Sequence, residues 1–187
     1  MLPIGVAING LTGDVRPSTG HYVKRLSDLR GLFQDDRAFE AAVAGRGDPI
    51  VYEVQEYRVA GSDLFFGTTT MFPGNVAGEY YMTRGHYHAR DDRGEVYHVQ
   101  SGSGVLVLEN RAGETGSVQL QAGVCAFIPP GWAHRSVVVG DDKLVLLWVC
   151  NVDAGNDYSE IIDHGMRLFV VEEDGRPCVR QNLPHMS

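Results

Sequence analysis

The chain has 187 residues, of which 43% are apolar and 21% are charged, and its formal net charge is -8 at pH 7. This length favours one domain, and the apolar fraction is sufficient to fill a substantial core. The acidic balance, without any cluster of Lys or Arg, argues against a nucleic acid as partner, because a phosphate-binding surface needs a basic stripe.

The N-terminal part of the chain predicts an irregular extension followed by a short helix. Its first residues are rich in Gly, Pro and Thr, which favour turns and loops. In the segment DDRAFEAAVAGRG, Asp35 or Asp36 can cap a helix, and Gly45 or Gly47 can end it. We expect the extension and the helix to occupy about residues 1–47.

From Pro49 onward the chain consists of short runs rich in Val, Tyr, Phe and Leu, separated by Gly, Asp and Asn. Many such runs at regular spacing predict an all-β sandwich or barrel. The runs are IVYEVQEYRV, DLFFGTTTMF, EYYMTRGHYH, EVYHVQSG, GVLVLEN, GSVQLQ, VCAFIPP, AHRSVVVG and KLVLLWVCNV. The segment MRLFVVEEDGRPCVRQNLP predicts one more hairpin that turns at Asp174 and Gly175. We predict a single domain over residues 1–187, with the β region at about 48–187.

Cysteine usage and hydropathy indicate where the protein works. Cys125, Cys150 and Cys178 are widely spaced and form no C-x-x-C pair, which argues against a disulfide framework and suits a reducing compartment. The start, MLPIGVAING, shows no basic leader, and no apolar run reaches the roughly 18 residues of a membrane span. We expect a cytoplasmic protein that does not enter a membrane.

Four possible metal donors are the most informative feature of the sequence. His86, His88 and Glu95 lie in GHYHARDDRGE, and His134 lies in PPGWAHRS. Residues two apart in an extended chain point to the same face, so the first two histidines can grip one ion. The polar stretch before Glu95 predicts a turn that returns the next strand alongside them. Three imidazoles and one carboxylate can bind a divalent metal and leave positions open for a substrate.

Each donor taken alone also has an ordinary structural explanation. A histidine in a strand is often a half-buried polar residue, and Glu95 can be a solvated charge in a turn that holds four others. All four together are much harder to explain by accident. His98 is the nearest other histidine, but in an uninterrupted strand it would face away from Glu95 and Tyr97.

The glycine and proline positions around the donors resemble the two motifs of the cupin superfamily. The first motif is matched by His86, His88, Glu95 and Gly102, with a longer insert than usual, and the second by Gly123, Pro129, Gly131 and His134. Val138 departs from the pattern, because the family often has Asn there. This resemblance implies an all-β cupin fold, a double-stranded β-helix or jelly-roll barrel with a short N-terminal helix, whose mouth holds the metal.

Within the cupins, the chain resembles the archaeal-type, metal-dependent glucose-6-phosphate isomerases nearly from end to end. The matching segments are RLSDLRGLF with DDRAF, DPIVYEV, FPG, TRGHYHARDDRGEVY, PPGWAHR and DAGNDY. The resemblance implies an aldose-ketose isomerase that interconverts glucose 6-phosphate and fructose 6-phosphate. It also implies that His86, His88, Glu95 and His134 hold one divalent ion per chain. We expect Fe²⁺ first, although Mn²⁺, Ni²⁺ or Zn²⁺ also suits these donors.

The same resemblance assigns residues to the substrate. Contacts with the phosphate carry over to Tyr52, Thr69, Thr83, Gly85 and Tyr158. Hydroxyls and a backbone N–H can bind a phosphate as neutral donors, so a basic cluster is not required. Tyr97 shares a face with Glu95 at two-residue spacing and is a further substrate candidate. Without the resemblance, Tyr52, Thr69 and Thr83 would be read as ordinary strand formers and Tyr97 as a possible core residue.

Two mechanisms are open for an isomerase with these residues. In the first, Glu95 is the catalytic base that moves a proton between C1 and C2 of the open-chain sugar through a cis-enediol. In the second, the hydrogen shifts as hydride with assistance from the metal, and Glu95 moves only hydroxyl protons.

Three positions depart from the isomerase pattern and leave the substrate open. Gly131 and Cys150 stand where tyrosines are expected, and Asn156 stands in place of a histidine. We expect all three residues to face the pocket. These changes would enlarge the pocket and remove a titratable imidazole, so the substrate could be a different phosphorylated sugar. The same donors would also suit a non-haem iron oxygenase or a non-catalytic cupin that binds a sugar phosphate. The family resemblance further implies a homodimer. Long edge strands of a jelly roll give a physical reason for it, because an uncovered edge favours pairing with another strand.

Overall fold

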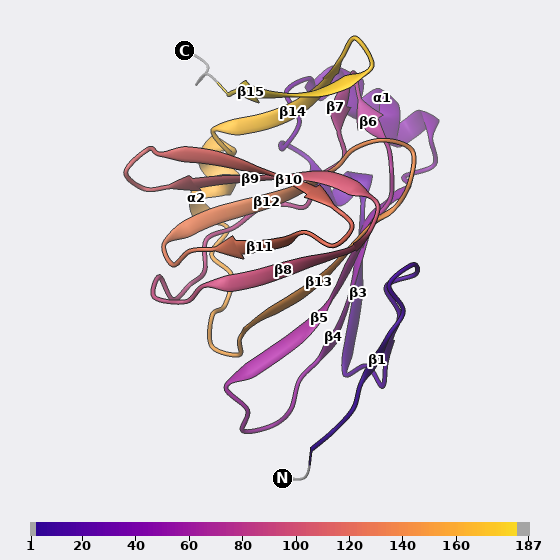
Figure 1. Cartoon of the computed structure of the whole chain (residues 1–187). Helices are drawn as coiled ribbons and strands as arrows, with labels where there is room; N and C mark the ends of the chain where they lie inside the picture. Colours follow the sequence, from indigo (N-terminus) through magenta and orange to yellow (C-terminus); the bar gives the residue numbers. More distant parts are fainter. Residues whose placement is uncertain (1–2, 183–187) are drawn as a thin grey trace.

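The structure, a computed structural model, describes residues 3–182 and is built around two antiparallel sheets (Figure 1). The strands of the larger sheet are β3 (Gly20–Arg25), β4 (Ile50–Tyr57), β5 (Leu64–Met71), β8 (Glu95–Ser101), β11 (Cys125–Ile128) and β13 (Leu144–Asn151). Those of the smaller sheet are β9 (Ser103–Asn110), β10 (Thr115–Gln121) and β12 (Trp132–Val138). The spatial orders are β11-β8-β13-β5-β4-β3 and β10-β9-β12.

The two sheets approach each other face to face. Glu95 at the start of β8 and His134 in β12 contact each other at 3.1 Å, although they belong to different sheets. Buried apolar side chains of both sheets, such as Val99, Leu106 and Leu146, form one continuous core. The predicted all-β jelly-roll fold of the cupin type is therefore confirmed, and most of its strands coincide with apolar runs of the sequence.

The remaining elements surround this double sheet. They are β1 (Ala7–Ile8), β2 (Val15–Arg16), the 3-10 helix η1 (Leu26–Leu29), α1 (Asp36–Gly45), β6 (Asn75–Val76), β7 (Glu79–Tyr80), α2 (Ser159–His164), β14 (Leu168–Glu173) and β15 (Arg176–Gln181). The last hairpin, β14-β15, turns at Asp174 and Gly175 as predicted, and both residues have positive φ values, of 50° and 73°. That geometry matches the right-handed twist of the paired strands.

Helix α1 confirms the one helix expected from the sequence. The Asp35 side chain accepts a hydrogen bond from the Ala38 N–H at 2.8 Å and so caps its first turn. Phe39 lies on the inner face with only 1% of its surface exposed. No helix among residues 3–182 is long and apolar enough to cross a lipid bilayer.

Two segments differ from the expectation. Strand β3 lies within the predicted N-terminal extension, yet it pairs with β4 and extends the larger sheet. The run EYYMTRGHYH, expected as a full strand, contains only β7 and isolated bridges at Met82, His86 and Tyr87. These bridges reach β12 and the segment near Asp157, which are distant in the sequence, so the local pattern could not reveal their irregular pairing.

Candidate functional site

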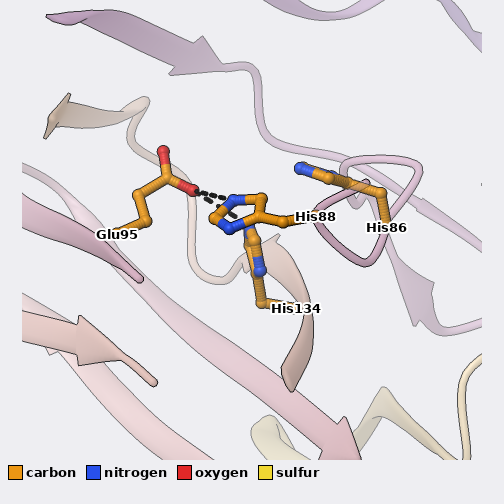
Figure 2. Close-up of side chains that lie close together, drawn as sticks. All are labelled: His86, His88, Glu95 and His134. Carbon is orange, nitrogen blue, oxygen red and sulfur yellow. Dashed lines mark hydrogen bonds and ion pairs between the residues drawn. The ribbon is translucent and has the colours of Figure 1, made fainter. Parts of the chain in front are cut away.

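The four predicted metal donors converge at one place between the two sheets (Figure 2). One ligand atom from each of His86, His88, Glu95 and His134 lies within 4.8 Å of the others. Glu95 comes from β8 and His134 from β12, whereas His86 and His88 come from the loop that precedes β8. His98 does not join them, and its ring instead lies 2.7 Å from the Gln100 amide.

Backbone and outer hydrogen bonds fix the orientation of the donors. The His86 N–H donates to the His134 carbonyl at 3.3 Å, and the His134 N–H returns a bond to the His86 carbonyl at 3.1 Å. The Nδ1 of His88 lies 2.9 Å from the Arg93 carbonyl, which leaves its Nε2 directed at Glu95. A bond of this kind to the outer nitrogen sets the tautomer and the ring orientation of a ligating histidine.

The electrostatics of the cluster favour an ionised carboxylate at Glu95. The Oε2 of Glu95 lies 3.3 Å from His88 Nε2 and 3.1 Å from His134 Nε2. Burial alone would raise the pKa of Glu95, but the close polar contacts with His134 and His88 and the nearby histidine charges outweigh it and lower the pKa to about 2. Burial and the neighbouring His134 hold the pKa of His86 well below its ordinary value. Burial acts to lower the pKa of His88, but the contacts with Glu95 and the Arg93 carbonyl outweigh it and raise that pKa.

These residues fit a divalent metal ion. The ring nitrogens of buried His134 have no hydrogen-bond partner among the described residues, since the short contact of its Nε2 with Glu95 lacks hydrogen-bond geometry. Buried polar atoms without partners are rare and call for a ligand. A negative carboxylate with three uncharged imidazoles provides borderline nitrogen and hard oxygen donors, which several first-row divalent ions accept.

A cavity of about 280 Å³ opens beside the cluster. It is lined by the donors His86, His88 and Glu95 together with Tyr97 and Thr69. Tyr97 packs edge-on against the His134 ring with 5.8 Å between centroids. Two substrate candidates predicted from the sequence therefore border the same cavity as the metal donors.

A second cavity, of about 310 Å³, adjoins the first and contains two cationic side chains. Tyr52, Tyr158, Lys24 and Arg84 line it, and it shares Tyr22 and Asn156 with the first cavity. The guanidinium of Arg84 lies 5.6 Å from the centre of the Tyr158 ring. Among residues 3–182, neither cation forms an ion pair with a carboxylate. One terminal nitrogen of Arg84 donates to the Asp28 carbonyl at 2.7 Å, which leaves its other donors and the Lys24 ammonium for an anion.

Thr83 and Gly85 are positioned differently from the other substrate candidates. The Thr83 hydroxyl accepts a hydrogen bond from the Ser136 N–H at 3.1 Å, which ties the loop to β12. Gly85 is buried and has a φ of 78°. Neither residue borders the two cavities, so their substrate contacts stay predictions.

Two of the three departures from the isomerase pattern border the pocket. Cys150 and Asn156 line the cavity beside the donors, and Cys150 pairs with Glu95 across β13 and β8. Burial raises the pKa of the Cys150 thiol, which keeps it protonated. Gly131 lies in the turn before β12 and does not line either cavity, so the expectation that all three face the pocket is only partly met.

Several residues of the pocket were not predicted from the sequence. Tyr22 and Lys24, two residues apart on β3, line the second cavity, although Tyr22 is partly exposed. Glu56 on β4 and Arg58 just after it border the metal-side cavity. Arg84 in the donor loop was also missed. In HYVK, Tyr22 and Lys24 are two residues apart and would share one face of a strand. This spacing could have indicated that both line the pocket only if the segment had been predicted as a strand of the sheet.

A jelly roll of two facing sheets, with three histidines and one carboxylate between them that could hold a metal ion, defines a protein of the cupin class. The model of the family described as Glucose-6-phosphate isomerase (GPI) matches residues 23–187. The chain belongs to this family.

Two curated relatives match most of the chain, and a solved structure overlaps part of it. The glucose-6-phosphate isomerase of Thermococcus litoralis is 40% identical over 182 residues, which cover 96% of this chain and 95% of the relative. That of Sinorhizobium medicae is 42% identical over 174 residues, covering 91% and 81%. A solved oxalate oxidase structure overlaps 59% of this chain and 56% of its own, with a TM-score of 0.49 and 18% identity.

Proposed function

We propose that the protein is a metal-dependent aldose-ketose isomerase that interconverts glucose 6-phosphate and fructose 6-phosphate. One observation supports this proposal above the others: two adjoining cavities have different chemistry. The first is bordered by the cluster of three histidines and Glu95, and the second contains the cationic side chains of Lys24 and Arg84. Family membership and relatives that match nearly the whole chain support this assignment.

The substrate phosphate binds at the cationic end of the pocket. Lys24 and Arg84 supply charge, and the hydroxyls of Tyr52 and Tyr158 supply neutral donors. Burial raises the pKa of Tyr52 to about 12, against the opposing effect of the Arg84 backbone and charge, so this hydroxyl keeps its proton and can donate it to a phosphate oxygen. The neutral donors expected from the sequence are thus supplemented by two cations.

The carbonyl end of the open-chain sugar lies against the histidine cluster. A divalent ion held by His86, His88, Glu95 and His134, for which we propose Fe²⁺, would supply a Lewis acid that stabilises the negative charge developing on the sugar. Tyr97 borders the space in which C1 and C2 must lie. Thr69, which the family resemblance assigned to the phosphate, lines the same cavity, and we propose that both residues orient the sugar hydroxyls.

Glu95 is the proton carrier of the reaction. Its Oε2 contacts His88 and His134, whereas Oε1 points away from both rings and has no partner among the described residues (Figure 2). Oε1 is therefore the oxygen that reaches the substrate. In the proton-transfer mechanism it removes a proton from one of the carbons C1 and C2 and returns it to the other.

Isomerisation in deuterated water separates the two mechanisms for this carboxylate. Transfer of a proton through Glu95 predicts deuterium at C2 of glucose 6-phosphate formed from fructose 6-phosphate. Complete absence of label, under conditions in which the carboxylate exchanges with solvent, favours the hydride shift instead.

A coupled isomerase assay on the reconstituted protein tests the proposed function directly. Protein loaded in turn with Fe²⁺, Mn²⁺, Ni²⁺ or Zn²⁺ is assayed with several hexose and pentose phosphates. We expect turnover of glucose 6-phosphate and fructose 6-phosphate, with Fe²⁺ as the most active ion. Saturable binding without turnover would identify a sugar-phosphate-binding protein, and oxygen uptake with substrate would identify an oxygenase; either result refutes the isomerase assignment.

The organisation of the protein in solution is part of the same proposal. We expect one domain, a cytoplasmic location and no nucleic-acid partner. We also expect a homodimer, because β11 and β3 are the edges of the larger sheet, and Phe127 on β11 leaves 63% of its surface exposed. Light scattering after size exclusion distinguishes a dimer from a monomer.

A further inference from the structure

The loop that carries His86 contains a β-bulge opposite Arg135. Met82 forms a β-bridge with Val137, and His86 forms one with His134. Between these two bridges the loop advances by four residues, whereas β12 advances by three. The extra residue leaves Arg84 and Gly85 together opposite Arg135. Bulges next to functional sites commonly redirect backbone groups out of the ladder.

Arg135 occupies the outer side of this bulge. Its Nε and terminal nitrogen both donate to the Arg84 carbonyl, at 3.2 Å and 2.7 Å. Only 2% of its surface is exposed, and the buried carboxyl groups of Glu79 and Glu109 lie near its guanidinium. Arg135 lines a separate hollow of about 260 Å³, away from the metal cluster.

The geometry of the peptide group determines where the next N–H points. In a trans peptide, the carbonyl and the following N–H point in opposite directions. Because the Arg84 carbonyl faces Arg135, the N–H of Gly85 points to the opposite side of the loop. The side chain of the preceding residue, Arg84, lines the second cavity with Tyr52 and Tyr158. The N–H of Gly85 has no acceptor among residues 3–182, and Gly85 is buried. Buried N–H groups without a partner are rare.

The glycine itself is adapted to the contact with Arg135. Gly85 has a φ of 78°, which glycine adopts without strain. A Cβ at this position would lie 3.0 Å from the Nε of Arg135 and 3.2 Å from its Cβ. Any side chain here would push the arginine and the peptide apart.

We propose that Arg135 is a positioning residue: it holds the Arg84 carbonyl behind the loop and thereby presents the Gly85 N–H to the phosphate of the substrate. The inference rests on the proposed isomerase function, which it deepens by assigning a residue outside the pocket to phosphate recognition. Without Arg135, the 84–85 peptide can rotate and turn a carbonyl oxygen toward the phosphate, which repels it.

The test measures phosphate recognition separately from metal binding. Glucitol 6-phosphate is an open-chain probe that cannot isomerise, and its dissociation constant is measured by calorimetry on the metal-loaded protein. For Arg135→Met we expect binding weaker by about tenfold or more. We also expect metal content equal to that of the wild type, and a rise in KM for fructose 6-phosphate that exceeds the fall in kcat. The matched control is Arg46→Met, which removes an exposed arginine that also donates to a backbone carbonyl, that of Asn75 at 2.6 Å.

Two further variants keep the test decisive if Arg135→Met does not fold. Arg135→Lys keeps the charge but loses the paired donors, and Gly85→Ala keeps Arg135 but displaces it. Each should weaken probe binding by about threefold or more while metal content is retained. Folded variants that bind the probe within about twofold of wild type, or that lose metal in parallel, overturn the inference. A wild type that binds the probe but does not isomerise refutes only the proposed function.

Discussion

The buried carboxylate of Glu79 makes a quantitative prediction about stability and pH. Only 4% of Glu79 is exposed, its Oε2 accepts a hydrogen bond from the Gln34 N–H at 2.8 Å, and its Oε1 has no partner among the described residues. Burial raises its pKa from 4.5 to about 7, although the Gln34 bond and the charge of Arg135 act in the opposite direction. The folded protein therefore holds this proton more tightly than the unfolded chain.

The sign of the effect follows from that difference. A carboxyl whose folded pKa is raised contributes stability that is fully present below its unfolded pKa and is lost as pH rises through its folded pKa. With about 1.4 kcal/mol per pKa unit, the wild type should lose about 3 kcal/mol from this group between pH 4.5 and 8. Glu79→Gln has no proton to release and retains an acceptor for Gln34.

Urea unfolding of both proteins across this pH range measures the difference. The free energy of unfolding of the wild type, minus that of Glu79→Gln, should decline by about 3 kcal/mol from pH 4.5 to pH 8, because contributions from the other groups cancel. A difference that stays constant within about 0.5 kcal/mol, or that increases with pH, shows that Glu79 does not take up a proton on folding.

The remaining predictions concern the pocket. Glu95→Gln should lower kcat by about 100-fold or more in the coupled assay and should weaken metal binding in a metal analysis. Full activity of this variant would exclude Glu95 as the proton carrier. Lys24→Met and Arg84→Met should each raise KM for sugar phosphate by about tenfold with metal content unchanged, and an equal effect from the exposed control Arg16→Met would contradict phosphate binding there. Cys150→Tyr narrows the cavity beside Glu95 and should reduce kcat/KM for larger sugar phosphates more than for smaller ones; equal changes across a substrate panel would show that Cys150 does not set specificity.

Local patterns in the sequence were sufficient to predict the strand series, the capped helix and the four residues that converge between the sheets. A run of β-branched and aromatic residues marks strands such as β4, and Asp35 marks a helix start. The spacing of His86, His88 and Glu95 is contained within ten residues. The hairpin at Asp174 and Gly175 was predictable for the same reason, because its turn residues stand between two apolar runs.

The distant segments that complete the pocket became evident only in the folded chain. Strand β3 joins the larger sheet by pairing with β4, about 30 residues further along, and this pairing brings Lys24 into the pocket near Arg84. Likewise, Cys150 borders the cavity and Gly131 does not, and Arg135 meets the Arg84 carbonyl through a bulge. Register and bulges depend on hydrogen bonds between strands that are far apart in the sequence, and a local pattern of residues contains no information about them.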